Sequence, residues 1–340
     1  MFLNQAIQFQ ESIFNGDFPN KNGQIKSISL FGNTIIHAIG IRPLMIHKYV
    51  EICSKYDYEY IKYILEHGIT IIPAFIYFLF EKGLIPFDDI VETLIDKHEL
   101  HPSIYFYDRI PDYQRFIADF SLNGDKKELA LLDKTGELFE LINYGFKQNS
   151  IEYSLKFDDI EKLEYIFSDP TINSNSKPEW SAFEWAFEPP ELSVLSFSGF
   201  FGSIKCFKYL FLKGYTISNK VIDSIICGGS HEMFHIANNT SLLSTESKIA
   251  ALKFYRNDFV NWIIEFGIQE PVFNENNLMS VQSMIKNPCL INNKDPNGNT
   301  ILHYASQKGY LSLVKYLVIN GADVNIYNRI WFSLFLIILN

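Results

Sequence analysis

The residues with the clearest potential for chemistry are His231 to His235, whose sequence HEMFH matches the H-E-x-x-H pattern of zinc hydrolases. On a helix, this spacing places two imidazoles on one face, where they can bind Zn²⁺ while the glutamate acts as general base. A third ligand is missing nearby, because residues 236–241 read IANNTS, and nothing distinguishes Glu246 or Glu265 as a more distant ligand. We therefore predict that this pentapeptide lies on a solvated helix face. A zinc-dependent hydrolase that uses His231, Glu232 and His235 is the alternative.

Other catalytic signatures are absent from the sequence. The stretch Cys227-Gly228-Gly229 lacks the spacing and the lysine of a phosphate-binding loop, and neither a Gly-x-Ser-x-Gly elbow nor a kinase signature occurs. We therefore expect no enzymatic activity, and we assign no catalytic, cofactor-binding or metal-binding residue.

The elements that must position these residues are short amphipathic helices with a recurring pattern. Counted from Gly309, apolar residues occupy positions +2, +5, +8 and +9, and glycine occupies position +12. The pattern recurs upstream, in full from Gly202 and Tyr56 and in weaker form from Asp133, Asp158 and Tyr255. Such spacing gives a helix one apolar stripe. Several copies in one chain indicate a stack of degenerate helix pairs.

The pattern also predicts how the two histidines are oriented. In the copy that begins at Gly229, His231 occupies position +2 and His235 occupies position +6. Lysines occupy position +6 in two other copies, at Lys208 and Lys315. His235 is therefore expected to face solvent.

Residues 295–325 form the most regular copy and read DPNGNTILHYASQKGYLSLVKYLVINGADVN. The first four residues favour a turn, because proline presets φ while asparagine and glycine tolerate the left-handed region. Gly321 follows the second helix, where a residue with positive φ commonly ends a helix. The stretch closely resembles an ankyrin repeat in its Thr300-Ile301-Leu302-His303 element and its exit, residues 321–325. Ile301 stands where that family prefers proline.

A second resemblance covers residues 195–267, with the segments SFSGFFGSIKCFKYLFLKG, IICGGSHEMFHIANN and FYRNDFVNWIIEFG. These resemble an ankyrin-like domain of uncharacterised function from the large ankyrin-repeat families of protists such as trichomonads. Those proteins carry the domain upstream of conventional repeats. Residues 41–53, IRPLMIHKYVEIC, are similar to their leader region. The resemblance implies an interaction protein and brings no catalytic residues.

We predict an all-α fold, an ankyrin-type helix-pair solenoid with degenerate N-terminal repeats. Neighbouring helix pairs are required, because a single repeat cannot bury its own apolar face. The expected divisions are a helical leader with degenerate helix pairs (1–150), the ankyrin-like domain (151–275), the ankyrin repeat (276–328, core 295–325) and an apolar tail (329–340).

Composition agrees with a folded protein and limits its partners. The hydrophobic content of 47% and mean hydropathy of +0.01 argue against wholesale disorder. The formal net charge of −10 opposes binding to nucleic-acid phosphates, and no run of lysine and arginine occurs. We therefore expect no nucleic-acid partner.

The cysteines indicate a reducing compartment. Cys53, Cys206, Cys227 and Cys289 form no C-x-x-C pair, and the N-terminal sequence lacks the basic and apolar regions of a signal peptide. Free thiols are typical of cytosolic proteins, so a cytoplasmic location is expected.

Two apolar runs are too short to span a bilayer, which takes about 20 residues. Residues 69–80 (ITIIPAFIYFLF) are predicted to form a buried core helix. Residues 330–339 (IWFSLFLIIL) replace the start of a further repeat, so we interpret the tail as a truncated next repeat. Because a solenoid normally ends in a polar cap, self-association through this apolar end is a further hypothesis.

The predicted function is a protein–protein interaction scaffold or adaptor with an unidentified protein partner; a structural homo-oligomer is an alternative. Recognition residues are expected at turn tips and on the exposed side of the first helix. By match to the ankyrin pattern, these are Pro296, Asn297, Asn299, Gln307 and Lys308. Structural roles are expected for Gly298, Thr300, Leu302, His303, Gly309 and Gly321.

Overall fold

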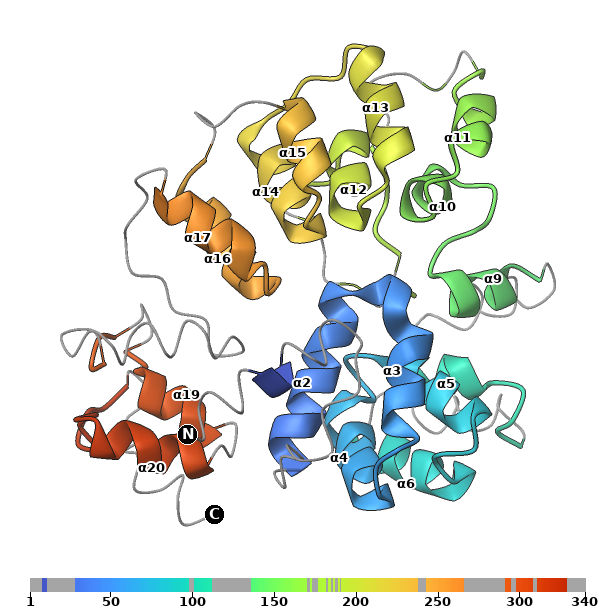
Figure 1. Cartoon of the computed structure of the whole chain (residues 1–340). Helices are drawn as coiled ribbons and strands as arrows, with labels where there is room; N and C mark the ends of the chain where they lie inside the picture. The colour runs from blue at the N-terminus through green and yellow to red at the C-terminus, as the bar shows by residue number, and fades with distance from the viewer. Residues whose placement is uncertain are drawn as a thin grey trace.

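The computed structural model describes residues 8–10, 28–97, 101–111, 136–169, 172, 177–181, 183, 184, 186, 189, 191–237, 243–265, 291–294, 298–307 and 311–328. Within these residues, all regular secondary structure is helical (Figure 1). The prediction of an all-α fold is therefore confirmed.

The N-terminal helices pack in two rows, which we call the N-terminal stack. In one row α4 packs against α2 and α6, and in the other α5 packs against α3 and the 3-10 helix η3. The bounds are α2 (Ile28–Ile41), η2 (Pro43–Met45), α3 (Ile46–Cys53), α4 (Tyr58–Gly68), α5 (Pro73–Glu81), α6 (Phe87–Lys97) and η3 (His101–Phe106). The pattern counted from Tyr56 lies on α4, where Ile61, Ile64 and Leu65 are buried.

The next helices form a second array, the middle stack. Helices α10, α12, α14 and α16 pack successively in one row, and α11, α13 and α15 pack successively in the other (Figure 1). The bounds are α9 (Glu137–Tyr144), α10 (Ile151–Lys156), α11 (Ile160–Ile166), α12 (Val194–Phe201), α13 (Ile204–Leu212), α14 (Asn219–Gly228), α15 (His231–Ala237), α16 (Thr245–Lys253) and α17 (Asn257–Glu265). Each helix of the first row also packs against the helix that follows it. The array is therefore the expected solenoid of helix pairs.

The turn inside each of these pairs has the same backbone conformation. The residue between the paired helices has a positive φ of 56° at Asp158, 74° at Gly202, 77° at Gly229 and 53° at Tyr255. These residues are the origins from which the sequence pattern was counted. Asp158 and Tyr255 occupy a region that glycine prefers, so the degenerate copies keep the turn even where glycine is lost.

A hydroxyl group caps the first helix of every pair in the middle stack. Ser150, Ser193 and Ser218 accept hydrogen bonds from the backbone amides three residues later, at 3.1, 3.2 and 3.2 Å. Ser244 forms a capping box with Ser247 at the start of α16. Such caps satisfy amides that have no partner within the helix. They define where each pair begins.

One glycine contact explains how closely the first-row helices approach. A Cβ atom at Gly228 of α14 would lie 2.0 Å from the carbonyl oxygen of Gly199 in α12. Only glycine permits this approach of two backbones. The pairing of α12 with α14 therefore depends on the residue type at position 228.

The apolar run at residues 69–80 is divided between a turn and a buried helix. Helix α5 begins at Pro73, a residue that is favoured in the first turn. Phe75, Ile76 and Leu79 are completely buried. In the described part of the chain, no helix combines the length and the apolar character needed to cross a membrane.

The C-terminal pair consists of α19 (Ile301–Gln307) and α20 (Leu311–Ile319), which pack against each other. Leu302, Leu313 and Leu317 are buried between them. Thr300 stands immediately before α19, where a serine stands before α12, α14 and α16. The apolar tail at 329–340 lies outside the described residues.

Candidate functional site

The H-E-x-x-H residues lie on α15, at the surface of the middle stack. Met233 and Phe234 are buried, whereas His231, Glu232 and His235 are exposed. Lys208 and Lys315, which share the +6 position with His235, are exposed as well. The orientation expected from the sequence pattern is therefore observed.

Two of these side chains are already engaged by neighbouring helices. Nε2 of His231 lies 2.5 Å from Oδ2 of Asp258, and its ring stacks on Phe259 at 4.2 Å between centroids. Glu232 forms an ion pair with Lys208 of α13 at 2.8 Å. A general base must be free to accept a proton from water, and Glu232 is paired with a cation instead. Across the described ranges, no three His, Cys, Asp or Glu side chains are grouped to hold a metal ion.

The Thr-x-Leu-His element of the C-terminal repeat forms a local hydrogen-bonded turn. Nδ1 of His303 accepts a hydrogen bond from the amide of Thr300 at 3.1 Å and lies 2.9 Å from the Thr300 hydroxyl oxygen. Both residues and Leu302 are buried. Gly298 and Gly321 have positive φ values of 81° and 94°. Gly309 lies outside the described residues.

The proposed recognition residues are only partly described. Gln307 is exposed at the end of α19. Asn299 is half-buried, and its Oδ1 accepts a hydrogen bond from Nδ2 of Asn328 at 3.0 Å, so it links two parts of the same repeat. Pro296, Asn297 and Lys308 fall outside the described residues. Of the two described residues in this set, Gln307 is therefore the one whose side chain is exposed.

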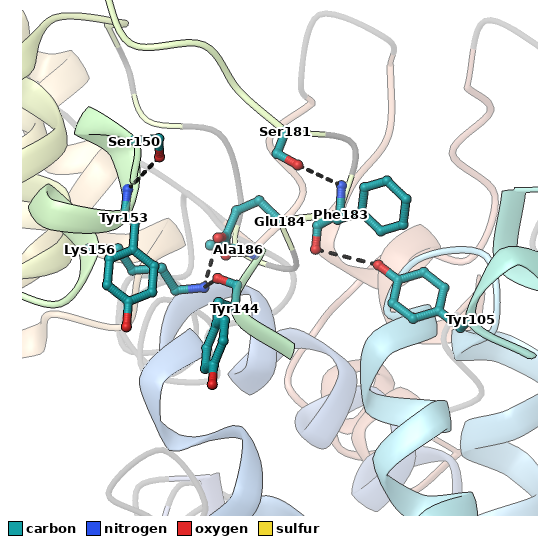
Figure 2. A network of polar contacts seen from close by, with 9 residues as sticks. All are labelled: Tyr105, Tyr144, Ser150, Tyr153, Lys156, Ser181, Phe183, Glu184 and Ala186. Atoms are coloured by element: carbon teal, nitrogen blue, oxygen red, sulfur yellow. Dashed lines mark hydrogen bonds and ion pairs between the residues drawn. The ribbon is translucent and has the colours of Figure 1, made fainter. Parts of the chain in front are cut away.

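A buried ion pair that no spacing pattern in the sequence predicts holds the connection between α11 and α12. Nζ of Lys156 lies 2.8 Å from Oε2 of Glu184, and both side chains are fully buried (Figure 2). Lys156 also donates to the carbonyl of Tyr144 at 2.9 Å, and the amide of Ala186 donates to Oε1 of Glu184 at 3.0 Å. Burial lowers the pKa of Lys156, while the adjacent carboxylate opposes that change.

The same connection reaches the N-terminal stack. The hydroxyl of Tyr105 in η3 donates to the carbonyl of Phe183 at 3.4 Å, and their rings are 5.7 Å apart (Figure 2). A sequence signal for this region exists in the alternation of aromatic and glutamate residues in EWSAFEWAFE, residues 179–188. Such a composition is unusual for a solvated connection.

A second polar junction joins α2 to the ends of α14 and α16. Arg256 donates from Nε to the carbonyl of Cys227 at 2.9 Å and from Nη2 to that of Gly228 at 2.5 Å. Arg42 donates to the carbonyl of Phe254 at 3.2 Å. Burial lowers the pKa of Arg256 to about 9 and that of Arg42 to about 10. Cations at helix C-termini donate hydrogen bonds to free carbonyl groups and interact favourably with the negative end of the helix dipole. This junction is therefore structural.

Comparison with known proteins supports the repeat assignment at the C-terminus. Residues 297–329 match the family model for the ankyrin repeat. No curated protein has significant sequence similarity to the chain.

Among solved structures, the chain is similar to one from the complex of the predatory endopeptidase Bd0816 of Bdellovibrio bacteriovorus with immunity protein Bd3460. The identity is 14%, the alignment covers 55% of this chain and 89% of that chain, and the TM-score is 0.26. A TM-score this low carries no argument about fold or function. The helix pairs and the matched family model together make this chain a helical repeat protein with an ankyrin repeat at residues 297–329.

Proposed function

We propose that this chain is a protein–protein interaction scaffold without catalytic activity. The observation that carries the proposal is the continuity of its architecture. The ankyrin repeat at residues 297–329 repeats the hydroxyl residue before the first helix that marks α12, α14 and α16. Arrays of this kind present an extended surface to other proteins, which supports a binding role.

Affinity capture with purified chain as bait tests the proposal. We expect a retained protein to be lost when Gln307 and Lys308 are both changed to alanine. Lys315→Ala is the matched control, because Lys315 is exposed on α20 of the same repeat. Asn299 is left unchanged, since its hydrogen bond to Asn328 gives it a structural role. Equal capture by the double variant and the control would move recognition to the upstream helix pairs.

A zinc-dependent hydrolase is the second candidate, because His231 and His235 stand one turn apart on α15. The candidate requires His231 to leave Asp258 and Glu232 to leave Lys208. Metal analysis after dialysis against Zn²⁺ tests it. One equivalent of zinc that is lost in the His235→Ala variant would support the hydrolase over the scaffold.

The finer features of the scaffold are also proposals. We infer a leader at 1–150, an ankyrin-like domain at 151–275 and a repeat region at 276–328, in the order found in the large protist families. Limited proteolysis that cuts near residues 150 and 275 would support these divisions. A cytoplasmic location belongs to the same proposal and can be tested by fractionation of the source cell.

Self-association through the C-terminal end is a further part of the proposal. Ile319, Val324 and Tyr327 are 83, 43 and 55% exposed at the last described repeat. Exposed apolar surface of this kind favours association. Size-exclusion chromatography with and without residues 330–340 tests this, and identical elution of the two forms as monomers would contradict it.

A further inference from the structure

The connection between α11 and α12 is much longer than the other connections in the middle stack. The left-handed residues Gly202, Gly229 and Tyr255 follow one another at intervals of 27 and 26 positions, whereas 44 positions separate Asp158 from Gly202. Connections of this length are uncommon in compact domains and are often functional. The additional length includes residues 177–191, which we call the strap.

The strap places side chains inside the middle stack. The ring of Trp180 packs against Phe197 and Phe201, with centroid distances of 5.5 and 6.3 Å. The carboxylate of Glu184 is fully buried against Lys156. The strap therefore contributes two side chains, the ring of Trp180 and the carboxylate of Glu184, to the surface formed by α9, α10 and α12.

That surface contains a cation enclosed by aromatic rings. Nζ of Lys156 lies 5.8, 5.5 and 5.9 Å from the ring centroids of Phe146, Phe157 and Phe201. The carbonyl of Tyr144 accepts one of its hydrogen bonds. The opposite charge at ion-pair distance comes from Glu184 of the strap. Because burying an ammonium group without a counter-charge is costly, this surface is built to receive a carboxylate.

We propose that the surface around Lys156 is a peptide-binding site for a carboxylate flanked by aromatic side chains, and that the strap is its intramolecular ligand. This inference rests on the proposed scaffold function and names the partner: a protein segment that carries glutamate or aspartate between aromatic residues. Such a segment places its carboxylate on Lys156 and an aromatic ring against Phe197 and Phe201. It takes the place of Glu184 and Trp180.

Two physical arguments favour an intramolecular ligand over a permanent part of the core. A buried ion pair often contributes no more to stability than well-packed apolar residues of the same size, so stability alone does not account for the pair of Lys156 and Glu184. A tethered segment also has an effective concentration in the millimolar range. It therefore excludes weak partners and yields to a segment that binds more tightly.

The experiment measures binding of a fluorescent peptide that copies residues 177–191 to the full chain. In the Glu184→Gln chain the strap loses its charge but keeps an amide oxygen that can accept from Lys156. Because the buried ammonium group then lacks a counter-charge, this chain should be less stable than the unmodified chain, and circular dichroism first establishes that it is folded. We expect this chain to bind the peptide at least tenfold more tightly than the unmodified chain does. A peptide carrying glutamine at the position of Glu184 should bind the variant at least tenfold more weakly.

Glu179→Gln is the matched control, because Glu179 lies in the strap with an exposed side chain. Its substitution in chain or peptide should leave both affinities unchanged. A folded Glu184→Gln chain that fails to bind the copied peptide at millimolar concentration would overturn the proposal. It would leave the scaffold function intact, since that rests on capture through other residues.

Hydrogen exchange in the unmodified chain tests the proposal without a substitution. The amide of Ala186 bonds to Oε1 of Glu184 and reports release of the strap. We expect it to exchange at least tenfold faster than the buried amides of α12, because the strap opens locally. Exchange of Ala186 at the same rate as α12 would make the strap a permanent part of the core and would contradict the inference.

Discussion

Lys156 and Glu184 lie 28 positions apart in the chain and form an ion pair with 2.8 Å between Nζ and Oε2, both side chains being fully buried. The pair attaches the strap to α10, and Tyr105 attaches the same strap to η3 of the N-terminal stack. One connection thus contacts both helical arrays. The position of the strap is therefore important for the whole molecule.

Replacing Lys156 with methionine should strongly destabilise the fold. The substitution leaves the carboxylate of Glu184 buried without a cation, and breaking such a pair typically costs about 3–5 kcal/mol. The double variant Lys156→Met, Glu184→Met should recover most of this loss, because both charges are then removed. Urea unfolding followed by circular dichroism measures both effects. A double variant no more stable than the single one would show that packing, not charge, dominates this site.

Asp158 should be important in two ways, through its backbone and its side chain. Its φ is 56°, and its Oδ1 accepts hydrogen bonds from the amides of Lys205 and Cys206 at 2.9 and 3.0 Å, at the start of α13. The Asp158→Ala variant lacks this cap, and alanine tolerates the left-handed region less well than aspartate. We therefore expect its free energy of unfolding to fall by about 1–3 kcal/mol. Asp158→Asn keeps both properties and should lose less than half as much. Equal losses in urea unfolding would contradict the capping role.

The helix pairs could be predicted from the sequence because their signal is local. The apolar stripe of α13, with Phe207 and Leu210, depends only on a spacing that buries one face of a helix. The exposed position of His235 followed from the same register. The serine caps at Ser193 and Ser218 are local signals too. They are present in the sequence, but the pattern of apolar positions does not include them.

The strap could not be predicted in the same way, because its contacts are not local. Nothing near Lys156 in the sequence indicates that Glu184 will neutralise it. The junction of Arg42 with Phe254 likewise joins residues 212 positions apart. A spacing pattern reports which side of a helix is buried but not which distant segment covers it. Long-range pairing of charges was therefore beyond the sequence analysis.

Gly321→Val tests the register of the C-terminal repeat. Gly321 has a φ of 94°, and a Cβ atom there would meet no heavy atom within 4 Å. Valine should therefore lower the free energy of unfolding through backbone strain alone. The left-handed region costs a residue with a Cβ atom about 1–2 kcal/mol relative to glycine. Asn tolerates this region, so Gly321→Asn should lose less. Thermal unfolding followed by circular dichroism compares the two variants, and unchanged melting of Gly321→Val would contradict the register.

Asp223 should make stability depend on pH in the acid range. Burial raises the pKa of this carboxyl above its ordinary value of 3.8, while hydrogen bonding from Ser247 and the charge of Lys220 oppose the change. The folded state therefore holds the proton more tightly than the unfolded state. As pH rises from 3.8 through the raised pKa, the free energy of unfolding contributed by this group falls. Asp223→Asn removes this dependence and should gain stability relative to the unmodified chain between pH 4 and pH 7.

Glu246 provides a control of opposite sign on the neighbouring helix. A hydrogen bond from Ser244 lowers the pKa of Glu246, so its folded state releases the proton more readily than the unfolded state. Its contribution is therefore present above its ordinary pKa and is lost as pH falls through the lowered value. Glu246→Gln should lose stability relative to the unmodified chain as pH rises from 4 to 7, the reverse of Asp223→Asn. Urea unfolding midpoints at pH 4 and pH 7 measure both trends. A shift of the same sign in both variants would contradict the opposite directions of the two pKa shifts.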